Sequence, residues 1–297
     1  MHMADALLSF PVAGVMLTVS GASLVIAGKK SAYLGEEKIP LLGVMGAFVF
    51  AAQMVNFTIP GTGASGHIGG GILLAALLGP APALLVMAAV LLIQCLFFAD
   101  GGLLAYGCNL FNLGICSSVL AYYLVYRPLA GNPKRLSLAA ILSAVVGLQL
   151  GSLALVGQVC LSGMTKLPFG AFAALMQPIH LLIGLAEGLI TAGVLIFIRR
   201  VRPELLYSRE KHSFAWKKPA VVILVIAVLL AGGLSILASA QPDGLEWALE
   251  KLGFQPGEDD AYGSPSLNLL GSGVVLIFLT VPGYLLWRLK KRPRGEN

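Results

Sequence analysis

The sequence predicts an all-α membrane protein, a polytopic helical bundle of about nine spans. Hydrophobic residues make up 57% of the 297-residue chain and charged residues only 11%, against about 25% charged residues in soluble domains. Apolar runs recur along the chain, most of them near the ~20 residues that cross a hydrocarbon core as a helix. The net charge of +6 comes from basic residues that crowd into a few loops, which is typical of membrane topology and not of nucleic-acid binding.

Each predicted span is an apolar run between charged or Gly- and Pro-rich loops. The spans are placed at residues 10–27, 39–56, 67–79, 81–98, 102–126, 137–160, 169–198, 219–240 and 266–288. The first seven form a predicted core over 1–200, and a basic cytoplasmic linker over 201–218 joins it to a two-span region over 219–297. The third segment begins at His67 and is the one least expected to cross fully, because ~13 helical residues reach only ~20 Å.

Charge placement predicts that the N-terminus faces out and the C-terminus faces the cytoplasm. With this orientation eighteen of the twenty Lys and Arg residues fall in inner loops, and only Lys166 and Lys251 fall outside. Acidic residues lean to the outer face, where they either attract cations or are ordinary solvated side chains. No basic residue precedes the first apolar run, so we expect the N-terminus to be retained in a multi-pass protein of the cell (inner) membrane.

The sequence predicts neither ATP hydrolysis nor a cysteine metal site. The segment closest to a P-loop, residues 21–31, separates its glycines by six residues and has Lys30 where Ser or Thr would meet magnesium. ATP-driven work would therefore need a partner protein. The four cysteines lie singly in or beside apolar segments and are interpreted as small packing residues; they are Cys95, Cys108, Cys116 and Cys160.

The start of the chain is a candidate metal chelate. Met1 is followed by His2, so the α-amine, the deprotonated His2 amide and the His2 imidazole offer three nitrogens, and fused chelate rings of this kind favour planar Ni²⁺ or Cu²⁺. His67, in a glycine-rich loop on the same predicted side, could supply a fourth nitrogen. The ordinary alternatives are a disordered terminus and a histidine that satisfies local hydrogen bonds.

A second polar pair lies within a predicted span. His180 and Glu187 are seven residues apart and therefore fall on one helix face, where ionisable groups are costly unless they are buried and paired. The pair predicts either an interhelical polar lock, which we favour, or a path for protons or ions.

Several segments in order carry a family resemblance over about residues 1–200. They are Met1-His2, the loop from Phe48 through Asn56 to His67, Ala99-Asp100-Gly101-Gly102 with Asn109 to Asn112, and His180 to Thr191. Together they resemble the CbiM/NikM family, the substrate-binding membrane components of energy-coupling factor transporters for cobalt and nickel. Residues 219–288, with Pro-Asp-Gly-Leu-Glu at 242–246, resemble the small two-span CbiN/NikN component fused to the same chain.

The resemblance implies a ligand set and a set of partners. The metal would be held by the Met1 amine, the backbone and ring nitrogens of His2, and His67. A transmembrane coupling component and two cytoplasmic ATPase subunits would drive import of Ni²⁺ or Co²⁺, with no resident cofactor and no enzyme activity. This chain reads Met3 where the family often has Ile, but that position supplies no ligand.

Two other functions are open to the same residues. Gly63-Ala64-Ser65-Gly66 matches the GxSG of intramembrane serine proteases, with His180 as the base. A passive divalent cation channel is the second alternative. A tightly chelating site argues against a channel, because a permeating ion must also leave quickly.

Overall fold

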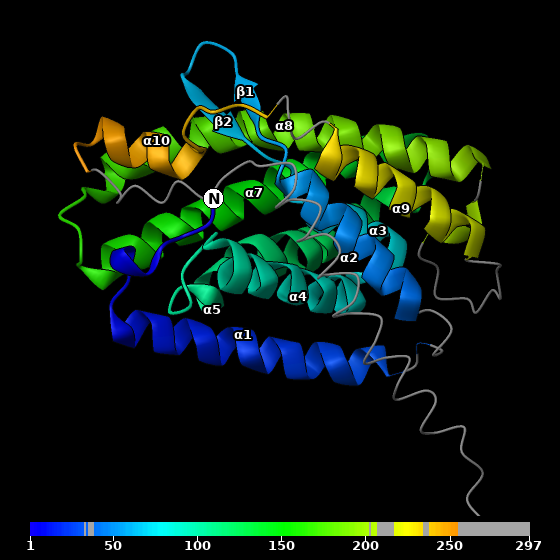
Figure 1. Ribbon diagram of the computed structural model, residues 1–297, viewed down its shortest axis with the longest axis horizontal. Coiled ribbons are helices and arrows are strands. Elements are labelled where there is room, and N and C mark those ends of the chain that lie inside the picture. The colour runs from blue at the N-terminus through cyan, green and yellow to red at the C-terminus, as the bar shows by residue number, and fades with distance from the viewer. Residues whose placement is uncertain (33, 35–38, 202, 207–216, 234–237, 255–297) are drawn as a thin grey trace, which may run out of the picture.

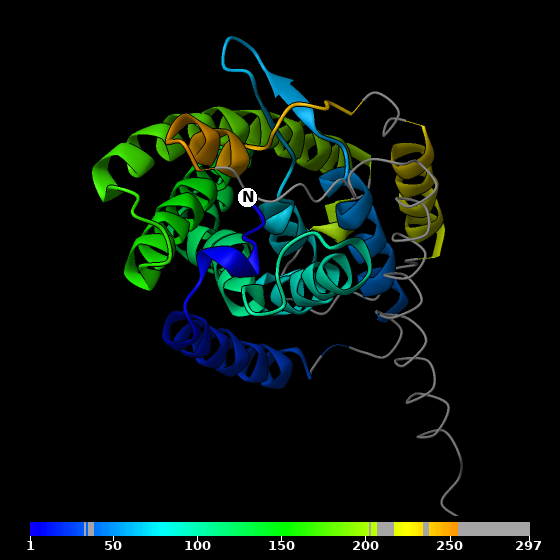
Figure 2. The ribbon, with the colours of Figure 1, turned by 60° about the vertical axis from the view of Figure 1, so that its left-hand side comes forward.

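The structure, a computed structural model, describes residues 1–32, 34, 39–201, 203–206, 217–233 and 238–254. It is a bundle of helices that run alongside one another, with a small hairpin and helix α10 at the surface of the bundle (Figure 1, Figure 2). The described helices are η1 (Asp5–Leu7), α1 (Phe10–Ser31), α2 (Ile39–Gln53), α3 (Gly71–Leu78), α4 (Pro80–Phe98), α5 (Tyr106–Asn109), the π-helix η3 (Leu110–Tyr126), α6 (Arg127–Ala130), η4 (Pro133–Arg135), α7 (Leu136–Ser162), α8 (Phe169–Val201), η5 (Pro203–Leu205), α9 (Lys217–Gly232) and α10 (Gly244–Lys251).

This mostly helical fold confirms the predicted class, with one addition. The loop after α2 forms an antiparallel hairpin of β1 (Phe57–Ile59) and β2 (Ala64–Gly66), in which Thr58 pairs with Ser65. Between the strands, Gly61 and Gly63 adopt φ +77°, a left-handed conformation that glycine adopts at little cost. His67 directly follows the β2 strand, so the hairpin fixes the position of its backbone.

Five described helical segments are long and apolar enough to cross a membrane. They are Phe10–Ser31, Pro80–Phe98, Tyr106–Ala130, Pro133–Ser162 and Phe169–Val201, whereas α2 and the apolar part of α9, Ala220–Gly232, are shorter. These elements correspond to seven of the nine predicted spans. The predicted span at 266–288 lies outside the described residues.

The predicted third span is a helix of 8 residues, α3. At 1.5 Å per residue it is about 12 Å long, well short of a ~30 Å hydrocarbon core. Gly70 before it and Gly79 after it both have positive φ, at 77° and 89°, so the chain turns at both ends of α3. Residues 67–79 are therefore a buried half-length helix preceded by a loop.

Close packing of α8 on α7 sets the position of the polar residues of α8. A Cβ on Gly184 would lie 2.9 Å from the Cα of Val145, and one on Gly188 would lie 2.6 Å from the Cα of Ile141. Small residues at this spacing let two membrane helices approach backbone to backbone. His180 and Glu187 consequently lie at the interior of the bundle, 1% and 2% exposed.

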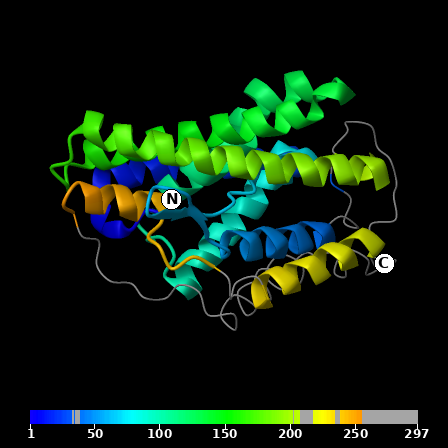
Figure 3. The same cartoon turned by 90° about the horizontal axis from the view of Figure 1, so that it is seen from above.

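The two elements from the C-terminal third pack on the core at separate places. Helix α9 lies along α2 (Figure 3), where Ala227 and Ala231 are buried with Ala51. Helix α10 lies against α8 and the hairpin, at the end of the bundle where α1 begins and α7 turns into α8 (Figure 1).

Candidate metal centre

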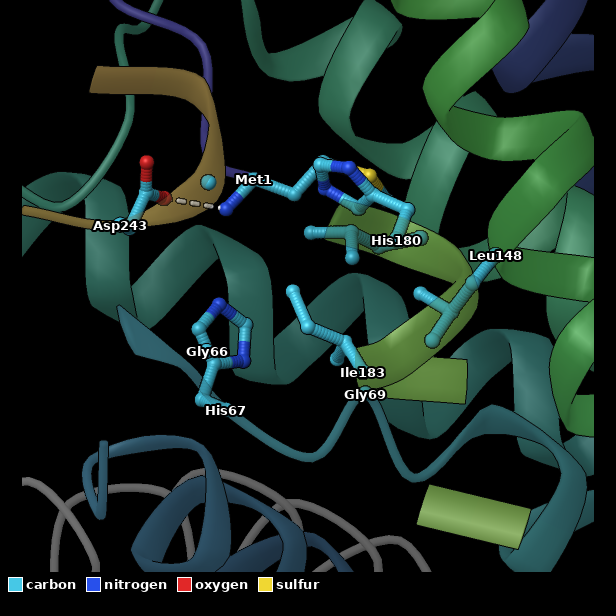
Figure 4. A pocket seen from close by; sticks show the side chains of 10 residues that line it. Met1, Gly66, His67, Gly69, Leu148, His180, Ile183 and Asp243 are labelled. Carbon is cyan, nitrogen blue, oxygen red and sulfur yellow. Dashed lines mark hydrogen bonds and ion pairs between the residues drawn. The ribbon is translucent and has the colours of Figure 1, made fainter. Parts of the chain in front are cut away.

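The N-terminus is buried inside the protein. Met1 is 4% exposed, and its amine forms an ion pair with the carboxylate of Asp243 (Figure 4). The side chain of His2 is 5% exposed, and its Nδ1 lies 3.0 Å from Oδ1 of Asp100. Chain termini are usually exposed unless specific contacts hold them, so specific contacts must hold the first residues in the core.

Backbone pairing inserts the first residues into the core. The Met3 amide donates to Oδ1 of Asn109 at 2.8 Å, and Asn109 Nδ2 donates back to the Met3 carbonyl at 3.1 Å. Gly102 N also donates to the Met3 carbonyl, at 2.9 Å. The Asp5 carboxylate accepts from the amide of Ala105 at 2.9 Å. Asn109 and the glycines after Asp100 thus hold the chain start in an extended path.

The loop that follows His67 is held by polar side chains from two helices. Glu187 accepts hydrogen bonds from the amides of Gly69 and Gly70 at 2.8 and 2.9 Å. Gln53 donates to the Gly69 carbonyl at 2.8 Å. This fixes the His67 imidazole against that of His2, with ring centroids 5.2 Å apart and the planes 16° from parallel.

Electrostatics keep both imidazoles neutral. Burial, followed by the positive charge of the N-terminus, lowers the pKa of His2 and that of His67 from 6.5 to about 3. At neutral pH each ring therefore carries one N–H and one nitrogen lone pair, which is the form that binds a transition metal.

Residues 241–247 cover the site at the surface of the helical bundle. Ser65 N donates to the Pro242 carbonyl at 2.7 Å, Ser65 Oγ donates to the Gln241 carbonyl at 2.7 Å, and the indole of Trp247 donates to the Thr62 carbonyl at 2.9 Å. The hairpin is the surface on which this segment is docked. The predicted outer loop is therefore in direct contact with the candidate site.

Asp243 has two roles at once. Its side chain caps α10 by accepting from the amides of Leu245 and Glu246, and the Glu246 side chain bonds back to the amide of Asp243. Burial opposes ionisation of Asp243, but the Met1 ammonium and the Glu246 amide hold the pKa of its carboxyl below the usual range. The carboxylate is therefore ionised beside the amine.

His180 and Glu187 do different things, although the sequence groups them. Glu187 is a polar lock between α8 and the loop after His67, as favoured from the sequence. His180 takes no part in that lock, because its Nδ1 bonds to the Met176 carbonyl at 2.7 Å and its ring faces a pocket shared with Met1 and His67. Nor do the described hydrogen bonds join His180 to Ser65, the pairing that a serine protease would use.

The three predicted ligand residues are thus brought together, but not as a set of side chains. Among the described residues, no group of three His, Cys, Asp or Glu side chains is close enough to hold a metal ion. A count of side chains does not include the Met1 amine and the His2 amide, which the sequence predicts as donors beside the imidazoles. One detail differs from the simple chelate: Nδ1 of His2 lies 3.0 Å from Oδ1 of Asp100.

Comparison with known proteins identifies the family of this chain. Residues 2–205 match the model of CbiM, the cobalt uptake substrate-specific transmembrane region. The chain belongs to the CbiM family. Residues 217–267 of this CbiM-family chain match the PDGLE domain, so the segment that covers the site belongs to a second recognised module.

Relatives of the CbiM-family chain include fused proteins of the same layout. An Archaeoglobus fulgidus protein whose name, NikMN, denotes a fused nickel transport protein is 34% identical over 93% of this chain and 96% of its own length. The fused nickel transport protein NikMN of Rhodobacter capsulatus is 32% identical over 67% and 64% of the two chains. The cobalt transport protein CbiM of Geobacter sulfurreducens is 26% identical over 97% and 89%.

The fold is also that of a solved transporter. The crystal structure of a truncated transition metal transporter superimposes with a TM-score of 0.61 at 28% identity, covering 67% of this chain and 99% of that one. The CbiM-family chain is a membrane protein and a component of nickel or cobalt transport.

Proposed function

We propose that this chain is the substrate-binding component of an ATP-driven energy-coupling factor importer, and that it captures Ni²⁺ or Co²⁺ with Met1, His2 and His67. The observation that supports this most is the buried N-terminal amine, which lies with two stacked neutral imidazoles. A nitrogen-rich site suits borderline transition ions, whereas Mg²⁺ and Ca²⁺ prefer oxygen ligands.

Capture is a ligand exchange, not covalent catalysis. The ion sheds water and bonds to the Met1 amine, the His2 amide nitrogen, the His2 ring and His67, while the amine and the amide each release a proton. Nδ1 of His2 is the ring nitrogen that closes a chelate ring with its own amide. The ring therefore turns about its Cβ–Cγ bond and leaves Asp100, and the Met1 ammonium leaves Asp243.

The partners and the membrane arrangement belong to the same proposal. A transmembrane coupling component and cytoplasmic ATPase subunits would reorient the chain in the cell (inner) membrane and release the ion inside. The site opens outward, with 1–200 as the metal-binding core, 201–218 as a cytoplasmic linker and 219–297 as a CbiN/NikN-like region. The charge distribution and the family resemblance support this arrangement.

Nickel is the proposed cargo over cobalt. Nitrogen sites bind Ni²⁺ more tightly than Co²⁺, and a planar site with an amide nitrogen suits Ni²⁺. Relatives named for each metal exist, so the choice depends on the ligands. Competition between radiolabelled nickel and cobalt for uptake in the same cells decides it.

The ligand assignment is tested with alanine variants of the purified full-length chain. His2→Ala and His67→Ala should each lower metal affinity by at least about tenfold and abolish uptake, because each removes a donor from a small set. His212→Ala, which alters the histidine in the predicted cytoplasmic linker, is the matched control. Tight metal binding by the His67→Ala variant would contradict the assignment.

The two alternatives are tested in the same cells. A passive channel takes up metal without the ATPase subunits and does not accumulate it against a gradient. The proposed importer requires the ATPase subunits and accumulates metal against a gradient. A serine protease loses its product on Ser65→Ala. The proposed importer tolerates that change, because the bond from the Ser65 amide to the Pro242 carbonyl remains.

A further inference from the structure

His180 is a buried imidazole in which one nitrogen is hydrogen-bonded and the other is not, among the described residues. Its Nδ1 bonds to the Met176 carbonyl at 2.7 Å, which makes Nδ1 the protonated nitrogen and places the lone pair on Nε2. The residue is 1% exposed, and Nε2 is without a hydrogen-bond partner among the described residues. Leaving a buried polar atom unpaired is unfavourable, so this nitrogen is a candidate to bind a ligand.

The spare nitrogen belongs to a pocket shared with the proposed capture site. Met1, His67, His180 and Asp243 all line one pocket, and Figure 4 shows the His67 and His180 rings with the Met1 amine around it. The pocket has a volume of about 10 Å³, room for about one water-sized particle. A single dehydrated ion fits such a space, whereas an organic ligand does not.

The covering segment closes one side of the pocket. Gly244 of the covering segment closes it beside His180, where a Cβ would lie 3.1 Å from Cε1 of the ring. Leu113, Leu148 and Ile183 line it as well, so part of the pocket wall is apolar.

The imidazoles of His67 and His180 are prepared in the same way. Nδ1 of His67 faces the Ile68 carbonyl at 3.3 Å, as Nδ1 of His180 faces the Met176 carbonyl. Metal-binding histidines almost always donate their second ring N–H to a carboxylate or carbonyl, which fixes the tautomer and makes the other nitrogen more basic. His180 has this arrangement without being among the residues assigned to capture.

We propose that Nε2 of His180 is an additional nitrogen donor to the transported ion, which it meets through the shared pocket as the ion passes inward from Met1, His2 and His67. This rests on the proposed function. The neutral His180 imidazole donates its lone pair as a bound water leaves, so the outer donors stay in place and no proton is released at this step. The ligand class is a borderline divalent transition ion.

The test uses Co²⁺ bound to the full-length chain in detergent. Paramagnetic Co²⁺ shifts the exchangeable N–H resonance of every coordinated imidazole, and ¹⁵N-labelled histidine identifies these signals. Wild type should show shifted signals from three imidazoles, including the shielded Nδ1–H of His180. Signals from only two would overturn the inference, and this measurement requires no variant to fold.

His180→Asn separates ligation from packing. Asn retains an N–H near Nδ1 that can donate to the Met176 carbonyl, but has no nitrogen lone pair at the Nε2 position. The variant should lose one shifted signal and at least about tenfold in uptake, while Co²⁺ stays at the outer site. An unchanged Co²⁺ spectrum, with or without lost uptake, would overturn the inference. Failure of wild type to bind Co²⁺ would instead overturn the proposed function.

Discussion

The carboxylate of Asp243 pairs with the amine of Met1, although 242 positions separate the two residues in the sequence. The same carboxylate caps helix α10. One side chain therefore fixes the start of the chain and the start of the covering helix, so the PDGLE segment is tied to the atoms proposed to bind metal.

Asp243→Ala should loosen α10 from the core by about 3 kcal/mol or more. Breaking a buried ion pair by removing one partner costs about 3–5 kcal/mol, and losing a helix cap costs about 1 kcal/mol. Amide hydrogen exchange of residues 244–251 measures the free energy of local opening.

Asp243→Asn is the matched control for the cap. Asn caps a helix as well as Asp, so this variant loses the charge and keeps the start of α10. Its protection should lie between those of wild type and Asp243→Ala. Protection equal to wild type would show that the pair with Met1 contributes nothing.

Acid should destabilise the protein through His2 and His67. Burial, then the N-terminal charge, lowers their pKa from 6.5 to about 3, so the unfolded chain binds protons that the folded chain does not. Their contribution is fully present above about pH 6.5 and is lost as the pH falls from there toward 3. The unfolding midpoint in detergent should fall over this window, and less steeply for His67→Gln. Equal slopes would contradict the neutral, buried state of His67.

Loosening the loop behind His67 should weaken metal binding. Glu187→Leu removes the acceptor of the Gly69 and Gly70 amides, so affinity should fall by about tenfold or more. Glu187→Gln keeps one amide oxygen as an acceptor and should fall less. Titration of the purified chain with Ni²⁺ measures both, and wild-type affinity in the Leu variant would show that the lock does not position His67.

Gly244→Ala should displace the covering segment. The new Cβ would lie 2.7 Å from Cγ2 of Ile179 and 3.1 Å from Cε1 of His180, and such overpacking costs about 1–3 kcal/mol. Protease cleavage within 238–254 should speed up. Gly157→Ala on α7 is the control, because a Cβ there meets nothing within 4 Å; equal cleavage of the two variants would contradict tight docking of Gly244.

The helices could be predicted because hydropathy and length are local properties. The run 67–98 shows the limit: it is almost continuously apolar, and hydropathy alone does not show that α3 ends after 8 residues. The turns depend on the positive φ of Gly70 and Gly79. The proximity of Met1, His2 and His67 followed from charge-based topology together with the family resemblance.

The partners of the site could not be predicted, because they come from distant segments. Asp100 and Asp243 lie on different elements from Met1 and His2, and only packing brings them together. One local signal exists at the covering segment: Asp243 and Glu246 have the spacing of a helix capping box, which marks the start of α10. Nothing in the sequence indicates that the start of α10 contacts Met1. Nor does the sequence indicate that His180 and Glu187 interact with different groups.

The most direct test of the account is metal binding by a chain that carries an N-terminal extension ending in a protease site, cleavage at which regenerates Met1. With the extension in place the amine is an amide and cannot act as a donor, so Ni²⁺ binding and uptake should be lost. Both should return after cleavage of the same preparation. Ni²⁺ binding of wild-type affinity before cleavage would contradict the central claim that the Met1 amine holds the metal.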